Sequence, residues 1–255
     1  MIGGRRTAHV ELYHFWDSFC SFKTRICLEE KSIPWVGHFI DLMAFENLKP
    51  DYLAVNPKGL VPVLRIDGAL IPESSIINEF LDDLQPEPGL RPRDPLARAR
   101  TRHWVKVEED ELFVAVRPAS LNLMMKQVFA RYSEADIDRF LASHPRPHQV
   151  PMLKKMFLDP PDPKAVDQSR KALAATLGRM DRSLQERGPW LAGATYSLAD
   201  IAAAPAIDRI ERLGMAALWD RLPAVTDWVA RLTDRPAYKK AAPREEFRLP
   251  RGRMP

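Results

Sequence analysis

The first 85 residues of the chain alternate between strand-like and helix-like hydrophobic patterns. Residues 8–14 alternate apolar and polar positions, as a strand with one buried face does, whereas residues 17–31 repeat their apolar positions at helical spacing. The same reasoning predicts strands at residues 32–41, 60–66 and 69–71, and helices at residues 50–54 and 74–84. The predicted order in this part is therefore β-α-β-α-β-β-α.

Turn and linker residues mark where these elements connect. Asp67-Gly68 lies between two of the predicted strands and is typical of a tight hairpin turn. Residues 85–95 are rich in proline and glycine, which indicates a linker. An α/β part therefore ends near residue 85, and a part of different character follows.

Beyond the linker the patterns are almost entirely helical. Helices are predicted at residues 96–125, 134–142, 163–185, 198–213 and 222–232. Pro118 should kink or end the first of them, because proline lacks the N–H that an inner helical turn needs. Two proline clusters, residues 144–151 and 159–163, should be irregular and exposed, and we expect this proline-rich stretch to carry some function or specificity.

Composition narrows the possible partners. The chain has 255 residues, of which 45% are hydrophobic, so it can bury a substantial core. Its net charge is only +4, with 38 Lys+Arg against 34 Asp+Glu, and the clearest basic clusters are Arg5-Arg6 and residues 248–253. These clusters are interpreted as solvated termini, so no nucleic-acid partner is expected.

Neither a membrane nor an oxidising compartment is indicated. The chain has no run of 18 apolar residues and begins without the apolar stretch of a signal peptide. Cys20 and Cys27 are its two cysteines, which indicates neither a disulfide framework nor a metal site. We therefore expect a cytoplasmic protein without a metal centre.

Pro62 stands inside a strand-like run, NPKGLVPVL at residues 56–64. A proline cannot donate to a strand ladder, so it is confined to edges, strand starts and bulges, or it takes a cis peptide bond in a tight turn. We expect a cis Val61–Pro62 bond that turns the backbone of Val61 outward. An extended peptide could then pair with Val61 as a short added strand.

The run NPKGLVPVL, together with PESSIINEFL at residues 72–81, resembles the glutathione-binding signature of the cytosolic glutathione transferases. The resemblance implies a thioredoxin-like α/β domain at residues 1–86 and an all-helical domain at residues 96–255 that contributes the pocket for an electrophile. It also implies glutathione as the bound cofactor, a hydrophobic small-molecule substrate and a homodimer.

The resemblance also implies a role for each residue of the signature. Val61, set by Pro62, would pair its backbone with the cysteinyl part of glutathione. Glu73 and Ser74 would hold the γ-glutamyl end, and Ser74 lies where a helix N-terminus binds anions. The alternatives are a plain helix cap for Ser74 and a solvated carboxylate for Glu73. Lys49 or Lys58 would face the glycyl carboxylate, unless both lysines are surface residues.

A second motif lies in the helical half. TYSLADIAAAP, at residues 195–205, resembles the N-capping box of the same family, with Ser197 as the cap and Asp200 returning a bond to the N–H of the cap. We assign this motif a structural role and no catalytic one.

Conjugation by such an enzyme needs the thiolate of glutathione, because the thiolate is the nucleophile. SFCSFKTRICL, at residues 18–28, resembles the start of the first helix in serine-type members, which include zeta-class enzymes, fungal relatives and bacterial β-etherases. This alignment gives Ser18 as the hydroxyl that activates the thiol. A beta-class alignment gives Cys20, which would form mixed disulfides, and one group of etherases aligns with Ser21. Each of these residues, or Asp17, is alternatively a simple helix cap.

The resemblance places an apolar electrophile pocket between the two domains. The candidate pocket residues are Phe15, Trp16, Trp104, Phe113 and Met124 or Met125, although residues at helical spacing also commonly form the core. The implied activity is glutathione transfer to an aromatic electrophile, or thiolytic cleavage of one such as an aryl ether, in detoxification. The alternatives are a glutathione-binding module without turnover and a Cys20-based, glutaredoxin-like transferase. A zeta-class isomerase fits less well, because the Ser-Ser-Cys of that class reads Ser18-Phe19-Cys20 here.

Overall fold

The computed structural model describes residues 9–252, so residue 8 of the first predicted strand, Arg5-Arg6 and Arg253 lie outside the described residues. A four-stranded sheet with the order β2-β1-β3-β4 forms the centre of the N-terminal part. Strand β1 pairs with β2 in parallel and with β3 antiparallel, and β3 pairs with β4 antiparallel. The strands are β1 (Val10–His14), β2 (Val36–Phe39), β3 (Val63–Ile66) and β4 (Ala69–Pro72).

Two strands are shorter than the hydrophobic pattern predicted. Strand β3 begins only after Pro62, which has no N–H for the ladder, and the Val61–Pro62 peptide bond is cis, as expected. Strand β2 begins at Val36 because Ser32 takes a left-handed backbone conformation (φ 51°) and Pro34 also lacks an N–H.

Three helices belong to the sheet-forming part: α1 (Phe19–Glu30), α2 (Pro50–Val55) and α3 (Ser74–Leu84). Helix α2 begins with proline at its first position, where the missing N–H costs no hydrogen bond. The predicted bounds of α3 agree with the structure. Short 3₁₀ turns, Leu42–Ala44 and Glu46–Leu48, lead from β2 into α2.

The rest of the described chain is helical, so the predicted fold class, a thioredoxin-like α/β part followed by an all-helical part, is confirmed. Its helices are α4 (Pro95–Val107), α5 (Phe113–Ser120), α6 (Lys126–Phe129), α7 (Glu134–Leu141), α8 (Val150–Leu158), α9 (Pro163–Arg187), α10 (Leu198–Arg212), α11 (Pro223–Asp234) and α12 (Pro236–Ala241). Short 3₁₀ turns lie at Pro147–Gln149, Ala216–Trp219 and Glu245–Phe247.

Helices α4, α5 and α6 follow one another without a loop, joined by π-helical turns at Glu108–Leu112 and Leu121–Met125. Pro118 lies inside α5 and does not end it, contrary to one of the predicted outcomes. The backbone widens into a π-helical turn three residues later, and the Asn122 side chain donates to the carbonyl of Pro118 at 2.8 Å.

The proline-rich stretch is more regular than predicted. Helix α8 begins at Val150, inside the first proline cluster, with Pro151 in its first turn, where proline is tolerated. Phe157 of this helix packs on Phe129 with ring centroids 4.3 Å apart, and Phe129 packs on Phe45 at 5.7 Å. These aromatic contacts join α8 to α6 and to the segment before α2.

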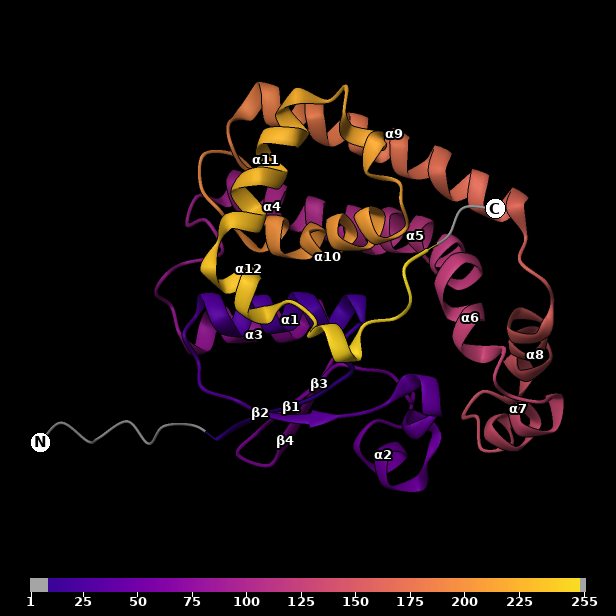
Figure 1. Ribbon diagram of the computed structural model, residues 1–255. Helices are drawn as coiled ribbons and strands as arrows, with labels where there is room; N and C mark the ends of the chain where they lie inside the picture. The colour runs from indigo at the N-terminus through magenta and orange to yellow at the C-terminus, as the bar shows by residue number, and fades with distance from the viewer. Residues whose placement is uncertain (1–8, 253–255) are drawn as a thin grey trace, which may run out of the picture.

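Figure 1 shows α1 and α3 between the sheet and the helical part, with α10 and α4 above them and α9 and α11 farther away. Ion pairs tie the parts together, among them two at α1. The buried Lys23 of α1 pairs with the buried Glu108. Arg235 donates two hydrogen bonds, of 2.6 and 2.7 Å, to the carboxylate of Glu30 in α1. The N–H of Leu198 also donates to the carbonyl of Leu90 in the linker at 2.9 Å.

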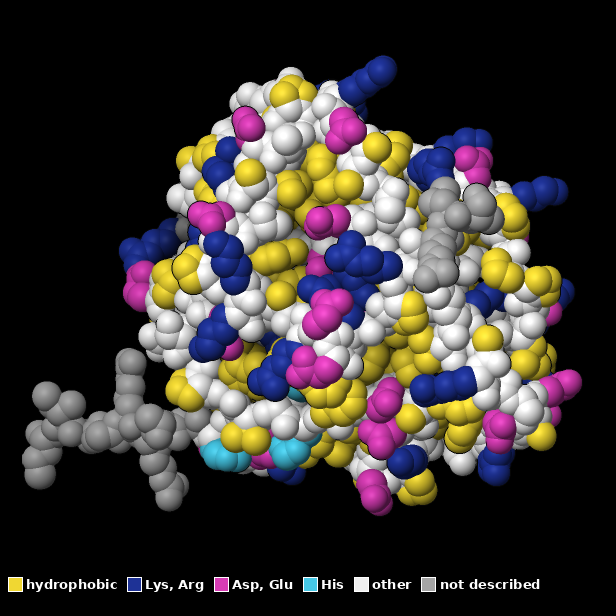
Figure 2. Space-filling model, in the orientation of Figure 1, with side chains coloured by type: hydrophobic (Ala, Val, Ile, Leu, Met, Phe, Trp, Pro, Cys, Tyr) yellow, Lys and Arg dark blue, Asp and Glu magenta, His cyan; other side chains and the backbone are white. Residues whose placement is uncertain are grey.

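The surface carries both signs of charge. On the face in Figure 2, Lys and Arg side chains are mixed with Asp and Glu, with apolar atoms between them. Over residues 9–252, no helix has the length and apolar character needed to span a bilayer. Nothing on the visible face resembles the single-sign field of a nucleic-acid interface.

Candidate functional site

The segments that carry the candidate residues adjoin the same end of the sheet, where β1 and β4 finish and β3 begins. Tyr13 pairs with Val63, and Val63 pairs with Pro72, so these residues form one row across β1, β3 and β4. Ser18 follows the end of β1, Val61 precedes the start of β3, and Glu73 follows the end of β4. The sheet register therefore brings together the activating, cysteinyl and γ-glutamyl positions predicted from the sequence.

Ser18 is the N-cap of helix α1. Its backbone is extended (φ −76°, ψ 126°), and its Oγ accepts a hydrogen bond from the N–H of Ser21 at 3.2 Å. A hydroxyl used as an acceptor still has its proton available to donate to another group. Because the positive end of the α1 dipole faces the same place, this position favours a negatively charged partner.

Cys20 and Ser21 suit this role less well. Burial raises the pKa of the Cys20 thiol and outweighs the opposing effect of Lys23, so the thiol stays protonated at neutral pH. The Cys20 side chain is nevertheless partly exposed at the surface. Ser21 is 0% exposed, and its hydroxyl has no hydrogen-bond partner among residues 9–252. A ligand sulfur would therefore reach Ser18 more easily than Ser21.

The loop before Val61 is held by side chains around it. The carbonyl of Leu60 accepts hydrogen bonds from the Tyr52 hydroxyl at 2.6 Å and from the Asn56 amide at 2.7 Å. The carbonyl of Gly59 accepts from the Asn47 side chain at 2.8 Å. In the part of the chain that the structure describes, the backbone N–H and C=O of Val61 have no hydrogen-bond partner. They remain available to an extended ligand.

Gly59→Ala is expected to destabilise the protein more than Gly68→Ala does. Both glycines have a positive φ, 64° and 89°, which costs an alanine about 1–2 kcal/mol. A Cβ at Gly59 would also lie 3.1 Å from the Asn47 carbonyl oxygen, whereas a Cβ at Gly68 meets nothing within 4 Å. Thermal unfolding of the two variants measures the difference, and equal losses would show that the Gly59 loop adapts freely.

Helix α3 begins with an unusual backbone at Glu73. The φ of this residue is 69°, a region that side chains with a Cβ rarely occupy, and such strain often marks functional sites. Glu73 is half-exposed and is the N-cap residue of α3, although its side chain makes no capping hydrogen bond. Ser74 is the first helical residue, so the alternative that Ser74 caps the helix is wrong. The first-turn N–H groups of α3, with Ser74 beside them, are therefore suited to bind an anion.

Each of the two candidate lysines forms an ion pair with a different glutamate. Lys58 Nζ lies 2.8 Å from Glu73 Oε1, and Lys49 Nζ lies 3.2 Å from Glu46 Oε1. Exposed pairs of this kind contribute only about 0.2–1 kcal/mol, so a ligand can displace them. Because Lys58 lies at Glu73, where the γ-glutamyl end was predicted, Lys49 is the better candidate for the glycyl carboxylate.

Most of the predicted pocket aromatics lie near the start of α1. Phe113 packs on Phe19, the residue after Ser18, with ring centroids 5.3 Å apart, and Phe15 packs on Phe39 at 5.9 Å. Trp16 stacks on Phe247 at 6.1 Å, and Phe247 also contacts Phe39 at 5.0 Å. Phe39 and Phe247 were not predicted from the sequence, because neither belongs to the signature motifs.

Trp104 and Met124 are placed elsewhere. Met124 is 0% exposed and belongs to the core, so of the two methionines only Met125 is partly exposed. Trp104 is buried beside a groove of about 310 Å³ between α4 and α9. That groove is lined by Arg100, His103, Trp104, Arg179, Arg182, Ser183, Glu186 and Arg187. We therefore do not retain Trp104 in the candidate site, since it lines this groove together with residues of α9.

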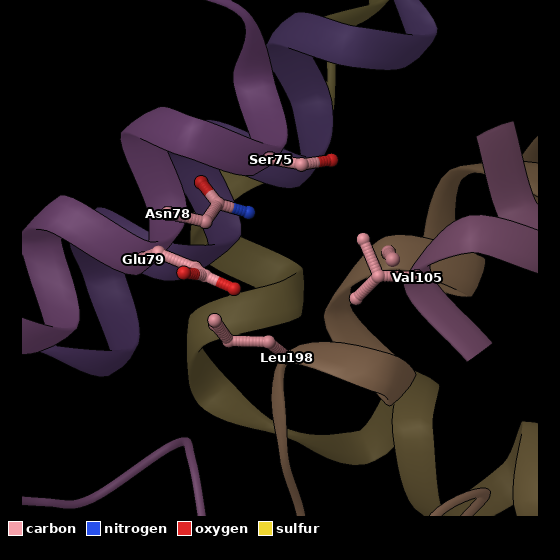
Figure 3. Close-up of a pocket in the computed structure, with 6 residues that line it drawn as sticks. Ser75, Asn78, Glu79, Val105 and Leu198 are labelled. Carbon is pink, nitrogen blue, oxygen red and sulfur yellow. The ribbon is translucent and has the colours of Figure 1, made fainter. Parts of the chain in front are cut away.

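A second cavity lies between α3, α4 and α10. Figure 3 shows Ser75, Asn78 and Glu79 of α3 facing Val105 and Leu198. Its volume is about 10 Å³, roughly what one water molecule needs, so it cannot hold a peptide or an aryl substrate. Within residues 9–252, no group of three or more His, Cys, Asp or Glu is placed to hold a metal ion.

Two charged residues near Ser18 have roles that the sequence did not reveal. Asp17 does not cap α1; its buried carboxylate pairs with Arg209 and Arg212 of α10. Arg25, 0% exposed, donates to the carbonyls of Trp16 at 2.8 Å and Ala241 at 2.9 Å. Both residues therefore stabilise the conformation of the loop between β1 and α1.

Two family models match the chain. The model described as "Glutathione S-transferase, N-terminal domain" matches residues 17–84, and the model described as "Glutathione S-transferase, C-terminal domain" matches residues 122–236. The first match contains Ser18, Val61, Glu73 and Ser74. Together the two matches cover more than half of the chain.

Several known proteins are similar over most of their length. Protein LigF of Sphingobium sp. strain SYK-6 is 27% identical over 91% of this chain and 92% of its own, and the crystal structure of this "Beta-etherase LigF" superposes with a TM-score of 0.82. "FtsZ-localized protein A" of Caulobacter vibrioides is 29% identical over 89% of this chain and 88% of its own. The maleylacetoacetate isomerase of Pseudomonas aeruginosa is 28% identical over 92% and 96%.

Proposed function

This chain belongs to the glutathione S-transferase family, and we propose that Ser18 activates the thiol of glutathione for attack on an aromatic electrophile. The chain is a glutathione-dependent enzyme that joins a thioredoxin-like part to a helical part. Its glutathione-binding domain is proposed to span residues 1–86, and its helical domain, which completes the electrophile pocket, residues 96–255.

The observation that carries this proposal is the geometry of Ser18. Its Oγ caps α1 by accepting from Ser21, which leaves the hydroxyl proton to donate to the glutathione sulfur. A hydrogen bond to the charged form of a thiol stabilises that form and lowers the thiol pKa. The sulfur can then form a bond to the electrophilic carbon, while the bond from that carbon to its leaving group breaks with the electron pair going to the leaving group.

The rest of the tripeptide is proposed to lie along the same end of the sheet. The backbone of Val61 pairs with the cysteinyl part, beside the cis Pro62. The carboxylate of the γ-glutamyl end lies at Ser74 and the α3 N-terminus, and its ammonium group lies at Glu73. Lys49 faces the glycyl carboxylate.

The proposed substrate class is aromatic. Phe15 is buried in the core, but the partly exposed side chains of Trp16, Phe39 and Phe247 form an aromatic rim that supports an aryl ring near Ser18. The similarity to a protein named a β-etherase supports cleavage of an aryl ether, with release of a phenolate, as the reaction. A panel of β-aryl ethers and aryl halides, incubated with glutathione and followed by mass spectrometry, should yield thioether adducts. A panel without any adduct would contradict the aryl substrate class.

One similar protein supports a second function. The name of "FtsZ-localized protein A" describes where a protein is found and not a reaction. A glutathione-binding module that recruits a protein partner is therefore the alternative to an enzyme of conjugation. Glutathione binding without conjugation, peroxidase or ether-cleaving activity would favour this alternative.

Glu73→Ala is expected to weaken the stabilisation that glutathione provides. Glutathione at about one hundred times its dissociation constant should stabilise the folded protein by about 2.7 kcal/mol, which corresponds to roughly 5–10 °C in Tm. Without the Glu73 carboxylate the ammonium group loses its charged acceptor, so this shift should shrink. Thermal unfolding with and without glutathione measures it.

Lys58→Ala is the matched control for that variant. It removes the same exposed ion pair with Glu73 but keeps the carboxylate, so most of the glutathione shift should remain. If Glu73→Ala kept the full shift, glutathione would have to bind away from the start of α3.

A homodimer in the cytoplasm is proposed as the working form. The family resemblance supports the dimer, and the free thiols Cys20 and Cys27 are consistent with a reducing compartment. Light scattering of the purified chain tests the assembly, and a monomer at micromolar concentration would contradict it.

A further inference from the structure

The carboxylate of Asp17, directly before Ser18, lies in a network of buried hydrogen bonds. Its side chain is 1% exposed. Arg212 Nη1 donates to both of its oxygens at 2.8 and 2.7 Å, and Arg209 Nη2 donates to Oδ1 at 3.0 Å. The N–H of Leu249, from the end of the chain, donates to Oδ2 at 2.6 Å. Residues far apart in the sequence thus meet at one carboxylate.

The segment that brings Leu249 to this carboxylate is residues 247–252, here called the C-terminal strap. Arg212 also donates, through Nη2, to the carbonyl of Leu249, and the N–H of Gly252 donates back to the carbonyl of Arg212 at 3.0 Å. Gln127 donates to the carbonyl of Arg251 at 3.2 Å. Figure 1 shows the strap in yellow, running from the region of α12 toward α6. On the way it passes the N-terminal end of α1, where Leu249 meets Asp17.

The strap is closely fitted at both ends. At its start, Phe247 stacks on Trp16, two residues before Ser18. At its end, a Cβ on Gly252 would lie 3.1 Å from Leu213 Cα and 3.3 Å from Leu123 Cβ, so a glycine is needed for this close approach. The strap therefore sits in a defined place against both the β1–α1 loop and the helical part.

The network fixes the backbone that leads into Ser18. Arg209 Nη2 also donates to the main-chain carbonyl of Asp17 at 2.7 Å, which belongs to the peptide group joined to the nitrogen of Ser18. That nitrogen donates to the carbonyl of Phe15 at 3.1 Å. Both sides of the peptide plane before Ser18 are thus held.

Stability alone does not explain such a network. Burying charges is costly, and apolar residues of similar volume often stabilise a protein as well as a buried ion pair does. What the planar arginine side chains add is geometric precision, because a guanidinium binds a carboxylate in a fixed orientation. A hydroxyl that must point at a sulfur atom needs such precision, since small misplacements of reacting groups cost rate.

We propose that Asp17 is a positioning residue for Ser18 and that the C-terminal strap holds the Asp17 carboxylate in place. Leu249 and the two arginines hold the Asp17–Ser18 peptide so that the Ser18 hydroxyl points toward the ligand sulfur. The backbone contact at Leu249 thereby acts on the catalytic rate without touching the reacting atoms. This inference rests on the proposed role of Ser18 in activating the thiol.

The test compares Leu249→Pro with Leu249→Ala. Asp17→Ala would leave two buried arginines unpaired and can fail to fold, so the strap is the better target. Proline removes the N–H that donates to Asp17 and keeps three side-chain carbons, whereas alanine keeps the N–H and loses more packing. With chlorodinitrobenzene as the electrophile, Leu249→Pro should lower kcat about tenfold while the KM for glutathione stays within about twofold. Leu249→Ala should keep a kcat close to that of the unsubstituted chain.

Hydrogen–deuterium exchange of the peptide containing Asp17 and Ser18 gives a second readout that needs no turnover. Exchange there should be faster in Leu249→Pro than in Leu249→Ala. Unchanged exchange, or faster exchange with an unchanged kcat, would overturn the inference. If the unsubstituted chain shows no conjugation at all, the proposed function fails, and the difference in exchange still decides whether the strap holds this peptide.

Discussion

Ser18→Ala should lower the rate of glutathione conjugation about ten- to a hundredfold, with glutathione affinity nearly kept. A hydrogen bond to a charged acceptor contributes about 1.5–3 kcal/mol, and each ~1.36 kcal/mol is tenfold in rate. The pKa of the bound thiol should rise in parallel, because the donor that favours the thiolate is gone. Steady-state kinetics across pH, with the absorbance of the bound thiolate, measure both effects.

Loss of the helix cap must be separated from loss of the catalytic hydroxyl. Ser18 also accepts from the N–H of Ser21, and removing a cap of this kind costs about 0.5–2 kcal/mol of stability. Ser18→Thr keeps both a cap and a hydroxyl, so it should restore much of the rate. Thermal unfolding of each variant shows how much of any loss is structural.

Cys20→Ala is the control that decides between conjugation and thiol exchange. Burial raises the pKa of the Cys20 thiol, so conjugation should survive its removal largely intact. The opposite pattern would be loss of activity in Cys20→Ala, retention in Ser18→Ala and a mixed disulfide between Cys20 and glutathione. That result would make the protein a thiol-exchange enzyme, and its chemistry would be redox.

The elements predicted well from the sequence are those whose stability is local. The capping box of α10 is confirmed: Ser197 and Asp200 exchange hydrogen bonds across three positions, and the motif can be read from those residues alone. The bounds of α3 follow from its hydrophobic periodicity for the same reason. The cis bond at Pro62 was predictable because proline itself restricts the backbone around it.

What the sequence could not show depends on contacts between distant segments. Asp17 reads as a helix cap because the pattern cannot show that Arg212 and Leu249, about two hundred positions away, will meet its carboxylate. The π-helical turns beside α5 depend on packing and leave no periodic signal. Helix α8 was hidden by the proline clusters around it, although its Phe157 packs against Phe45 and Phe129, which come from two other segments.

The pairing of Lys58 with Glu73 illustrates the same limit within the site. The signature motif placed both residues near glutathione but did not show that they lie 2.8 Å apart. Their separation depends on the turn at Gly59 and on the backbone of Glu73, both of which have a positive φ. Motif reading therefore gave the candidate residues of the site, whereas their mutual geometry required the fold.

Asp200→Ala should cause the largest loss of stability among the substitutions considered. Asp200 is 0% exposed, and its carboxylate accepts from the N–H of Leu191 at 2.9 Å, from Trp228 Nε1 at 2.9 Å and from the N–H of Ser197 at 3.0 Å. Each buried donor left without an acceptor costs about 1–3 kcal/mol, so the loss should be at least about 3 kcal/mol. In thermal unfolding this corresponds to a Tm lower by roughly 6–12 °C or more.

Asp136→Ala is the matched control, because Ser133 and Asp136 form the same capping box at the surface. Its loss should be clearly smaller, because the backbone N–H of Ser133 is exposed and can bond to water once the carboxylate is gone. If both variants lost the same stability, burial would not be what makes the Asp200 box important.

The two boxes should also respond to pH in opposite directions. Burial raises the pKa of Asp200 to about 6, above its ordinary value, so the folded state binds a proton more readily than the unfolded state does. The stabilising contribution of this group is full below the unfolded pKa and falls as the pH rises through about 6. The stability deficit of Asp200→Ala against the unsubstituted chain should therefore grow on acidification from pH 7 to pH 4.5.

Asp136 should behave in the opposite way. Hydrogen bonding from Ser133 lowers the pKa of Asp136, so the contribution of Asp136 is lost on acidification and the stability deficit of Asp136→Ala should shrink. Denaturant unfolding at the two pH values measures both deficits, and a parallel change in the two variants would contradict the raised pKa of Asp200.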